Sequence, residues 1–432
     1  MDLNDFLKSE INLNEFKIKD LSLAKEGKEK ILWSEKNMPV LQKIKERFSK
    51  EKPLKGLKIG ACLHITSETA ALMNCLLSGG AEIFLAASNP LSTQDDVAAA
   101  LVENGIHVFG WRGESNEDYY WCIKKVLEQK PNLIHDDGAD MISFIHQNFK
   151  KDEINIFAGF EETTTGVNRL KALESENKLF FPVFAINNAN TKRLFDNRYG
   201  TGQGAIFGIL NGLHILLAGK TIVVAGYGWV SKGIALRASG NGAKVIITEV
   251  DPIKALEAYM DGFQVLPMEE AIKLADIVIT ATGCIDVVRK EHLLNAKNGV
   301  ILCNAGHFDV EINKEDLNEL SINKREIFPY VTEYTLYDGR KIYLLADGRL
   351  VNLVLGRGHP PEIMDLSFSL HALCAEYVIK NKDKLNLKAK VYDVPLEVDI
   401  KIAETKLSSL GIKIDTLTNK QKLYLESWKY GT

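Results

Sequence analysis

The stretch from Thr221 to Asp251, TIVVAGYGWVSKGIALRASGNGAKVIITEVD, constrains the fold of this 432-residue chain more than any other segment does. A short apolar run ends in the turn Gly226 to Gly228, and a helical pattern opens after Ser231. A second apolar run follows this pattern and ends at Glu249. The order of strand, glycine turn, helix and strand is typical of a unit that binds a dinucleotide.

Each part of this unit has a physical role toward such a ligand. Gly226 permits the tight turn, Gly228 lets the backbone approach a pyrophosphate, and the helix N-terminus offers free N–H groups and a partial positive charge. Glu249 can accept both hydroxyls of the adenosine ribose and would repel a 2′-phosphate, which favours NAD over NADP. Ser231 replaces the third glycine of the pattern, so we expect a slightly displaced helix and an intact site. The alternative is an ordinary tight turn in an α/β fold.

Composition excludes several classes of protein. A net charge of −4 leaves no basic surface of the kind that nucleic acids bind, and a hydrophobic content of 46 % is ample for two or three domains with sizeable cores. The six cysteines form no CxxC pair, as expected of small buried residues in a reducing compartment. The opening MDLNDFLKSE carries no apolar stretch, so we expect no secretory signal and a cytoplasmic location. The apolar segment 205–218 is too short to span a bilayer and predicts a buried core helix, not a membrane helix.

From Leu57 onward, apolar strands alternate with helical segments, which predicts parallel sheets covered by helices on both faces. Ligands bind such sheets at the carboxyl ends of the strands. The polar residues that fall there are His64, Thr66, Asp136, Asp137, Glu161 and Glu162. Taken singly, the histidine is more often structural and the two aspartates could cap the next helix. Their convergence favours a functional site.

Further along the chain, Lys192 and Asp196 are four residues apart and share one face of a predicted helix. A surface ion pair is the alternative, but the preceding FPVFAINNAN is apolar and uncharged. Two later strands end in small residues, the second of them just before His307. The sequence KIYLLADGRLVNL predicts a hairpin with its turn at Asp347 and Gly348. His359 stands before two prolines that open a helix, and the last forty residues form a charged helical segment.

These motifs together resemble the S-adenosyl-L-homocysteine hydrolase family, in particular its archaeal and thermophilic-bacterial branch. The resemblance runs from about Trp33 to Thr432, and the motifs that carry it, in the family's order, are CLHITSETA, LSTQDD, HDDGAD, EETTTGV, TKRLFDN, GYGWVSKG, TEVDP, TGCID, GHFDVEI, RLVNL and GHP. The resemblance implies reversible hydrolysis of S-adenosyl-L-homocysteine to adenosine and L-homocysteine. In that chemistry, bound NAD⁺ oxidises the ribose C3′, a base removes the C4′ proton, homocysteine leaves from C5′, water adds, and the hydride returns.

The resemblance also assigns roles to residues. Lys192 and Asp196, with Glu162 beside them, would handle the 3′-hydroxyl, and Asp137 would be the base at C4′. We expect the pKa of the lysine to be lowered by burial so that it can act as a base. His64 with Asp137 would serve the chemistry at C5′. The residues expected to recognise the adenine are Thr66, Glu68 and His359.

A larger set is expected to hold the cofactor. Asn197, His307 and the three threonines 163–165 would place the nicotinamide against the sugar, and we predict no metal site. The predicted cofactor-binding residues are Thr163, Thr164, Thr165, Asn197, Gly226, Gly228, Trp229, Val230, Glu249, Lys254, Thr282, Gly283, Gly306, His307 and Asn352. The resemblance further implies a homo-oligomer, a tetramer.

The predicted fold is α/β, with two doubly wound Rossmann-like parallel-sheet domains and a small C-terminal helical tail. A discontinuous substrate-binding domain would take residues 1–190 and 356–388, the NAD-binding domain residues 191–355, and the tail residues 389–432.

Three other functions stay open. The same mechanism could act on another 5′-substituted nucleoside such as S-inosylhomocysteine, the chain could be a conventional dehydrogenase that exchanges NAD with solution, or it could be an inactive binding homologue. Retention of Asp137, Lys192 and Asp196 together argues against the last of these.

Overall fold

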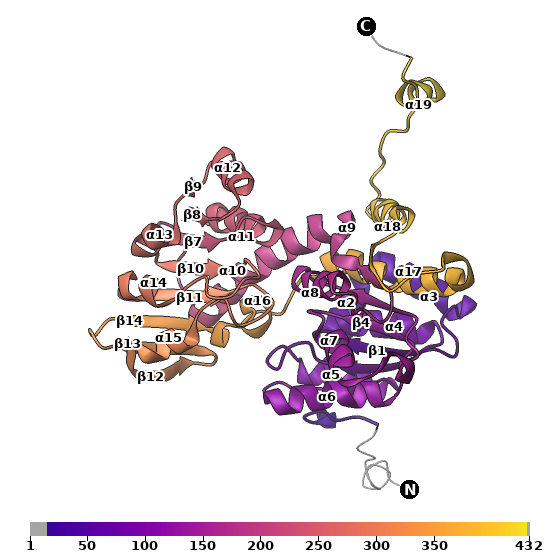
Figure 1. Ribbon diagram of the computed structural model, residues 1–432, viewed down its shortest axis with the longest axis horizontal. Helices are drawn as coiled ribbons and strands as arrows, with labels where there is room; N and C mark the ends of the chain where they lie inside the picture. Colours follow the sequence, from indigo (N-terminus) through magenta and orange to yellow (C-terminus); the bar gives the residue numbers. More distant parts are fainter. Residues whose placement is uncertain (1–14, 430–432) are drawn as a thin grey trace.

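The computed structural model describes residues 15–429, which form two α/β lobes, each built on its own sheet (Figure 1). The predicted fold class, two Rossmann-like α/β units followed by C-terminal helices, is confirmed. The opening residues, for which we expected no secretory signal, lie outside the described part of the chain, as do the last three.

The first sheet has seven strands, all parallel, in the order β15-β6-β5-β4-β1-β2-β3. Successive residues of β1 and β2 point to opposite faces: Ile59 and Ile83 pack in one apolar cluster, and Cys62 and Phe84 in another. Both faces are therefore buried, as the near-continuous apolar strands predict. The strands are β1 (Lys58–Cys62), β2 (Glu82–Ala86), β3 (His107–Phe109), β4 (Leu133–Asp136), β5 (Ala158–Glu161), β6 (Val183–Ala185) and β15 (Val391–Asp393).

Helices cover both faces of this sheet (Figure 1). The first apolar cluster draws on α3, α4, α5 and α17, and the second on α6, α7 and α8. The helices are α2 (Ala24–Lys36), α3 (Pro39–Glu51), α4 (Ser67–Ser78), α5 (Asp95–Glu103), α6 (Asn116–Glu128), α7 (Asp140–Asn148), α8 (Thr164–Ser175) and α17 (Pro361–Leu385), with short 3₁₀ turns at Leu21–Leu23, Lys151–Glu153 and Ile186–Asn188.

The second sheet has eight strands in the order β12-β13-β14-β11-β10-β7-β8-β9. Six of them run parallel, and β12 and β13 join as an antiparallel pair at one edge. The strands are β7 (Thr221–Ala225), β8 (Lys244–Thr248), β9 (Gln264–Val265), β10 (Ile277–Thr280), β11 (Val300–Asn304), β12 (Ser321–Phe328), β13 (Val331–Leu336) and β14 (Lys341–Leu345). The helices of this lobe are α10 (Thr201–Leu213), α11 (Trp229–Gly240), α12 (Pro252–Met260), α13 (Met268–Leu274), α14 (Lys290–Asn295), α15 (Lys314–Glu319) and α16 (Val351–Val354).

The hairpin predicted around Asp347 and Gly348 is wrong. The strand β14 does belong to a hairpin, but its partner is the preceding β13, and RLVNL continues into α16. Ala346, Asp347 and Gly348 all have positive φ, at 56°, 51° and 74°, and form a 3₁₀ turn. Three left-handed residues in succession turn the chain away from β14 instead of back along it, and Val351 is fully buried as a result.

The chain passes between the lobes twice. It leaves the first lobe through α9 (Asn190–Lys192) and the π-helical segment Arg193–Gly200, and it returns between α16 and α17. After α17, strand β15 pairs with β6 at the edge of the first sheet, so residues beyond 388 contribute to that sheet as well as to the tail. The tail helices are α18 (Leu396–Ser409), packed on α17, and α19 (Asn419–Leu425), which extends away from both lobes (Figure 1). The domain boundaries stay a prediction.

The apolar segment at 205–218 lies mostly in α10, where Ala205, Ile206 and Ile209 are buried in the core of the second lobe. Within residues 15–429, no helix is both long enough and apolar enough to cross a membrane.

Candidate active site

A cavity of about 1070 Å³ is lined by residues from both lobes. Its wall includes the carboxyl ends of strands in both sheets, as expected for folds of this type. Every residue predicted as catalytic, substrate-binding or cofactor-binding lines it: His64, Thr66, Glu68, Asp137, Glu162, Thr163, Thr164, Thr165, Lys192, Asp196, Asn197, Gly226, Gly228, Trp229, Val230, Glu249, Lys254, Thr282, Gly283, Gly306, His307, Asn352 and His359. The sequence therefore located one continuous site.

The two aspartates after β4 have different positions. Asp136 is fully buried, and its carboxylate accepts hydrogen bonds from the backbone N–H of Ile142 in α7 (2.8 Å) and of Asp137 (3.0 Å). Burial raises the pKa of Asp136 to about 7. Asp137 turns the other way and lines the cavity. The helix-capping alternative thus holds for the first aspartate of the pair and not for the second.

The two glutamates after β5 divide in the same way. Glu161 is fully buried and accepts from the backbone N–H of Gly138 (2.8 Å) and of Thr163 (2.9 Å), so it ties together the loops that follow β4 and β5. Glu162 reaches the cavity wall. Since side chains alternate along an extended strand end, one acid of each pair supports the loop and its neighbour faces the ligand.

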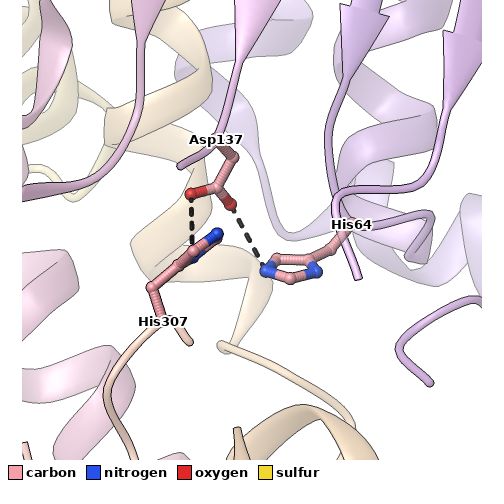
Figure 2. Close-up of side chains that lie close together, drawn as sticks. All are labelled: His64, Asp137 and His307. Carbon is pink, nitrogen blue, oxygen red and sulfur yellow. Dashed lines mark ion pairs between the residues drawn. The ribbon is translucent and has the colours of Figure 1, made fainter. Parts of the chain in front are cut away.

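Asp137 lies between two histidines (Figure 2). Its Oδ2 is 3.4 Å from His64 Nε2, and its Oδ1 is 3.6 Å from His307 Nδ1. His64 comes from the first lobe and His307 from the loop after β11 in the second, so this cluster spans the two lobes. Burial lowers the pKa of His64 to about 4, so the imidazole is neutral near pH 7, and Ser92 Oγ at 2.8 Å holds its Nδ1. The spacing of the three groups would also suit a divalent cation.

Lys192 is at the centre of a second buried cluster. Its ammonium donates to Asn197 Oδ1 (2.7 Å) and lies 3.3 Å from Glu162 Oε1 and 3.7 Å from Asp196 Oδ2. The expected lowering of its pKa is wrong. Burial alone would lower the pKa of Lys192, but the carboxylates of Asp196 and Glu162 outweigh burial and raise it. The lysine is therefore an ammonium at neutral pH.

Asp196 is fully buried and has two partners besides Lys192. Ser367 Oγ of α17 donates to its Oδ2 at 2.6 Å, and His359 Nδ1 lies 2.8 Å from its Oδ1. His359 Nε2 in turn faces Thr201 Oγ1 at 3.1 Å. His359, which we expected at the adenine, thus lines the cavity with one ring nitrogen fixed on Asp196.

The π-helical segment that carries Asp196 and Asn197 is uncommon in proteins and is found mostly at functional sites. The close approach of this segment to α11 depends on a glycine, because a Cβ at Gly233 of α11 would lie 1.7 Å from Arg198 O.

The turn after β7 has the form that a pyrophosphate requires. Gly226 has φ of 92°, a left-handed conformation that favours glycine, and a Cβ added to Gly228 would meet nothing within 4 Å. The open side of this turn and the N-terminus of α11 face the cavity. Ser231 is buried and donates its hydroxyl to Ala281 O at 3.3 Å, so the serine fits where the pattern has glycine.

Glu249 at the end of β8 is fixed by backbone donors. Its Oε2 accepts from Tyr227 N at 2.7 Å, and its Oε1 accepts from Val250 N at 2.7 Å and from Asp251 N at 3.0 Å. These bonds fix the carboxylate in the wall of the cavity, where the ribose of NAD would contact it. The residues present therefore fit NAD.

The sequence alone missed several parts of the site. Glu311 shapes the loop after β10 by accepting from the backbone N–H of Thr282 (2.9 Å) and of Gly283 (2.8 Å), and Met364 and Phe368 of α17 supply an apolar part of the wall. The i, i+4 spacing of the last two was the only signal, and it is shared by any helix that packs on a core.

A dinucleotide-binding sheet that shares one cavity with two buried acid–base clusters defines an NAD-binding enzyme. Residues 15–159 match S-adenosyl-L-homocysteine hydrolase, and residues 197–358 match the S-adenosyl-L-homocysteine hydrolase NAD binding domain. The chain belongs to the S-adenosyl-L-homocysteine hydrolase family.

Relatives in this family carry two different names. The adenosylhomocysteinase of Saccharolobus solfataricus is 58% identical over 96% of this chain and 100% of its own length, and that of Aquifex aeolicus is 58% identical over 97% and 100%. The S-inosyl-L-homocysteine hydrolase of Methanocaldococcus jannaschii is 55% identical over 96% of this chain and 100% of its own length. Overall identity to these relatives therefore does not separate the adenosyl from the inosyl substrate.

Proposed function

We propose that this enzyme hydrolyses S-adenosyl-L-homocysteine to adenosine and L-homocysteine, reversibly, through transient oxidation of the ribose. NAD, when bound, supplies the acceptor for the hydride of C3′ and returns it at the end. The observation that carries the proposal is the division of the cavity's titratable groups into two buried clusters. The reaction needs proton transfer at the 3′-oxygen and again at C4′ and C5′.

The cluster around Lys192 suits the 3′-oxygen. An ammonium with a raised pKa stabilises the oxygen as its proton leaves, and a carboxylate beside it takes up that proton. Burial raises the pKa of Glu162 well above the ordinary value, which makes it a competent proton acceptor at 3.3 Å from the lysine. Burial would raise the pKa of Asp196, but the positive charge of Lys192 and the hydrogen bond with His359 lower it. Asp196 therefore keeps its charge and holds the ammonium in place.

The cluster around Asp137 suits C4′ and C5′. Asp137 would remove the C4′ proton, which the neighbouring ketone makes acidic. His64, neutral at pH 7, can pass a proton between the leaving sulfur and the incoming water. Asp137 lies between His64 and His307. The same carboxylate can therefore take part in proton transfer at C4′ and at C5′.

The preference for an adenine base rests on Glu68 at the start of α4. Its side chain lines the cavity with 6% of the residue exposed, and its Oε1 accepts from Ser34 Oγ and Ser67 Oγ, both at 2.9 Å. Two hydroxyl donors favour the ionised carboxylate. A carboxylate accepts from the N6 amine of adenine, whereas it would meet the oxygen of hypoxanthine with an unpaired charge, a mismatch of about 1–3 kcal/mol.

The second candidate substrate is S-inosyl-L-homocysteine. Burial raises the pKa of Glu68, and a protonated Glu68 would donate to the hypoxanthine oxygen. Relatives from Methanocaldococcus jannaschii and Methanopyrus kandleri bear that substrate in their names.

Comparison of kcat/KM for the two thioethers tests the assignment. We expect the wild type to prefer the adenosyl compound by about tenfold or more. The Glu68→Gln variant should lose most of that preference, because an amide both donates and accepts. Asn74→Ala is the matched control on the same helix, since Asn74 bonds Glu35 (3.1 Å) and lies outside the cavity wall. Equal kcat/KM for both substrates in the wild type would overturn the adenine assignment and favour the inosyl compound.

A further inference from the structure

Two fully buried histidines lie behind Glu162, outside the cavity wall. His371 of α17 places its Nε2 at 2.8 Å from Glu162 Oε2. Its Nδ1 lies 2.8 Å from Nδ1 of His135, which comes from β4 and stacks on Phe160 with ring centroids 4.8 Å apart. The two imidazoles are separated by 236 residues along the chain. Together with Glu162 and Lys192 they form a continuous polar line through the core.

The hydrogen-bonding capacity of this line selects one arrangement of protons. One N–H must lie between the two Nδ1 atoms and one proton between His371 Nε2 and Glu162. If His371 donates from Nε2 to the carboxylate, its Nδ1 accepts from His135, and His135 Nε2 is left as a bare lone pair. In the opposite arrangement Glu162 is protonated and His135 Nε2 keeps a buried N–H without a partner. An orphaned buried N–H is costly and rare, and Lys192 at 3.3 Å favours the charged carboxylate, so the first arrangement is preferred.

We propose that His371 and His135 are positioning residues for the reaction: His135 fixes the Nε2–H form of His371, and His371 holds Glu162 Oε2 so that Oε1 faces Lys192. This inference rests on the proposed function, because it assigns to Glu162 the proton of the 3′-hydroxyl. In many enzymes a carboxylate orients a catalytic imidazole. Here an imidazole, His371, orients a catalytic carboxylate, and a second imidazole, His135, orients the first.

The electrostatics of the surroundings support two neutral rings. Burial, and after it the charge of Lys192, lowers the pKa of His371 to about 3. Burial and the neighbouring ring of His371 lower the pKa of His135 well below the usual range. The charged groups that face His371 and Glu162 are Lys192 and Asp196 from the crossing segment and Asp137 from the end of β4. Neither ring therefore gains a proton in the working pH range, and His371 holds Glu162 as a neutral hydrogen-bond donor.

A pair of substitutions at position 371 separates hydrogen bonding from packing. His371→Leu removes the donor to Glu162, and we expect kcat to fall roughly tenfold to a hundredfold with KM changed little. His371→Gln keeps an N–H donor on a side chain that does not titrate, so kcat should stay within about threefold of the wild type. Ser369→Ala on the same helix is the control, since that buried hydroxyl has no hydrogen-bond partner, and its kcat should be unchanged.

A double variant tests whether His135 acts through His371. His135→Leu alone should lower kcat by about threefold to tenfold, because His371 then adopts either tautomer. In the His371→Gln background the same change should have no further effect, since an amide needs no partner to choose its tautomer. If the two side chains served only to pack the core, the decreases in kcat caused by His135→Leu and His371→Gln would multiply in the double variant. That outcome would overturn the assignment of His135.

The pH dependence of kcat separates hydrogen bonding from packing, because a change in packing alone would leave the acid limb in place. Activity falls at acid pH when Glu162 takes up a proton. Loss of the His371 donor raises the pKa of Glu162, so the acid limb of kcat should move to higher pH in His371→Leu and stay in place in His371→Gln. A His371→Leu enzyme with wild-type kcat and an unshifted acid limb would overturn the proposal.

A measurement without substrate distinguishes this inference from the proposed function. In protein labelled with ¹⁵N at histidine, assigned by comparison with the two variants, the ring shifts should show Nε2–H at His371 and Nδ1–H at His135. The reverse tautomers would overturn the inference whether or not the enzyme turns over. A wild type that shows these tautomers but cleaves neither thioether would contradict the proposed function and, with it, the role given to the line.

Discussion

Lys192 Nζ and Asp196 Oδ2 lie 3.7 Å apart across one turn of the helical segment that joins the two lobes, with 4% and 1% of their side chains exposed. A surface ion pair at this spacing contributes little, but a buried one fixes both groups, since neither tolerates the loss of its partner. The pair therefore sets an ammonium at the wall of the cavity, next to Glu162.

The Lys192→Met variant removes that ammonium while keeping a chain of similar length. We expect kcat to fall by about 10²-fold or more, because the 3′-oxygen loses its charge stabilisation and Glu162 its neighbour. Bound NAD, measured after denaturation of the purified protein, should be retained. More than about a tenth of wild-type kcat in this variant would contradict the role of the lysine.

The paired aspartates after β4 should respond differently to the same change. Asp136→Asn weakens the hydrogen bonds to the backbone of Asp137 and Ile142, so we expect the free energy of unfolding to fall by about 1–3 kcal/mol with kcat within tenfold of the wild type. Asp137→Asn should lower kcat by about 10²-fold or more with less effect on unfolding. Denaturant unfolding and steady-state kinetics on both variants check this, and the reverse pattern would exchange the two roles.

Replacement of Glu249 by serine should change cofactor choice. Glu249 and Lys254 both line the cavity. If the carboxylate binds the adenosine ribose, as we propose, its removal should weaken NAD binding and relieve the repulsion of a 2′-phosphate. The ratio of the Kd for NADP to that for NAD, measured by titration of the cofactor-free protein, should fall. A wild-type protein that purifies with NADP bound would refute the assignment.

The preference for the adenosyl substrate should depend on pH. Burial raises the pKa of Glu68, so the carboxylate takes up a proton at a higher pH than an exposed glutamate does. Because only the ionised form accepts from the adenine amine, the ratio of adenosyl to inosyl kcat/KM should be largest at high pH and decrease as pH falls. In Glu68→Gln the ratio should not vary with pH. A wild-type ratio that rises toward acid pH would contradict the model of recognition.

Local pattern was enough to predict the parallel strands of both sheets and the residues at their ends, but not the antiparallel edge formed by β12 and β13. The turn at Gly226 and the acids 136, 137, 161 and 162 were placed correctly because strand ends in a parallel sheet converge. Pattern did not show which acid of each pair faces the cavity, since both read as polar residues after an apolar strand. That choice depends on which backbone N–H groups lie nearby, as for Asp136 and Ile142.

The features of the site that the sequence did not predict depend on contacts between residues far apart in the chain. The contact of His135 with His371 joins a strand to a helix 236 residues away, and no local spacing marks it. The raised pKa of Lys192 depends on Asp196 and then on Glu162, and only the folded chain places Glu162 beside the lysine. The false hairpin arose because Asp347 and Gly348 form a strong turn signal, which here changes the direction of the chain without pairing two strands.

Simultaneous measurement of free homocysteine and of NADH, with S-adenosyl-L-homocysteine as substrate, tests the central claim most directly. A cofactor that is reduced and reoxidised within each turnover leaves no net NADH. We therefore predict homocysteine and adenosine in equal amounts over many turnovers, with no NADH beyond the enzyme's own bound cofactor. NADH that accumulates in step with product would indicate a conventional dehydrogenase, and the absence of homocysteine would contradict the proposed hydrolysis.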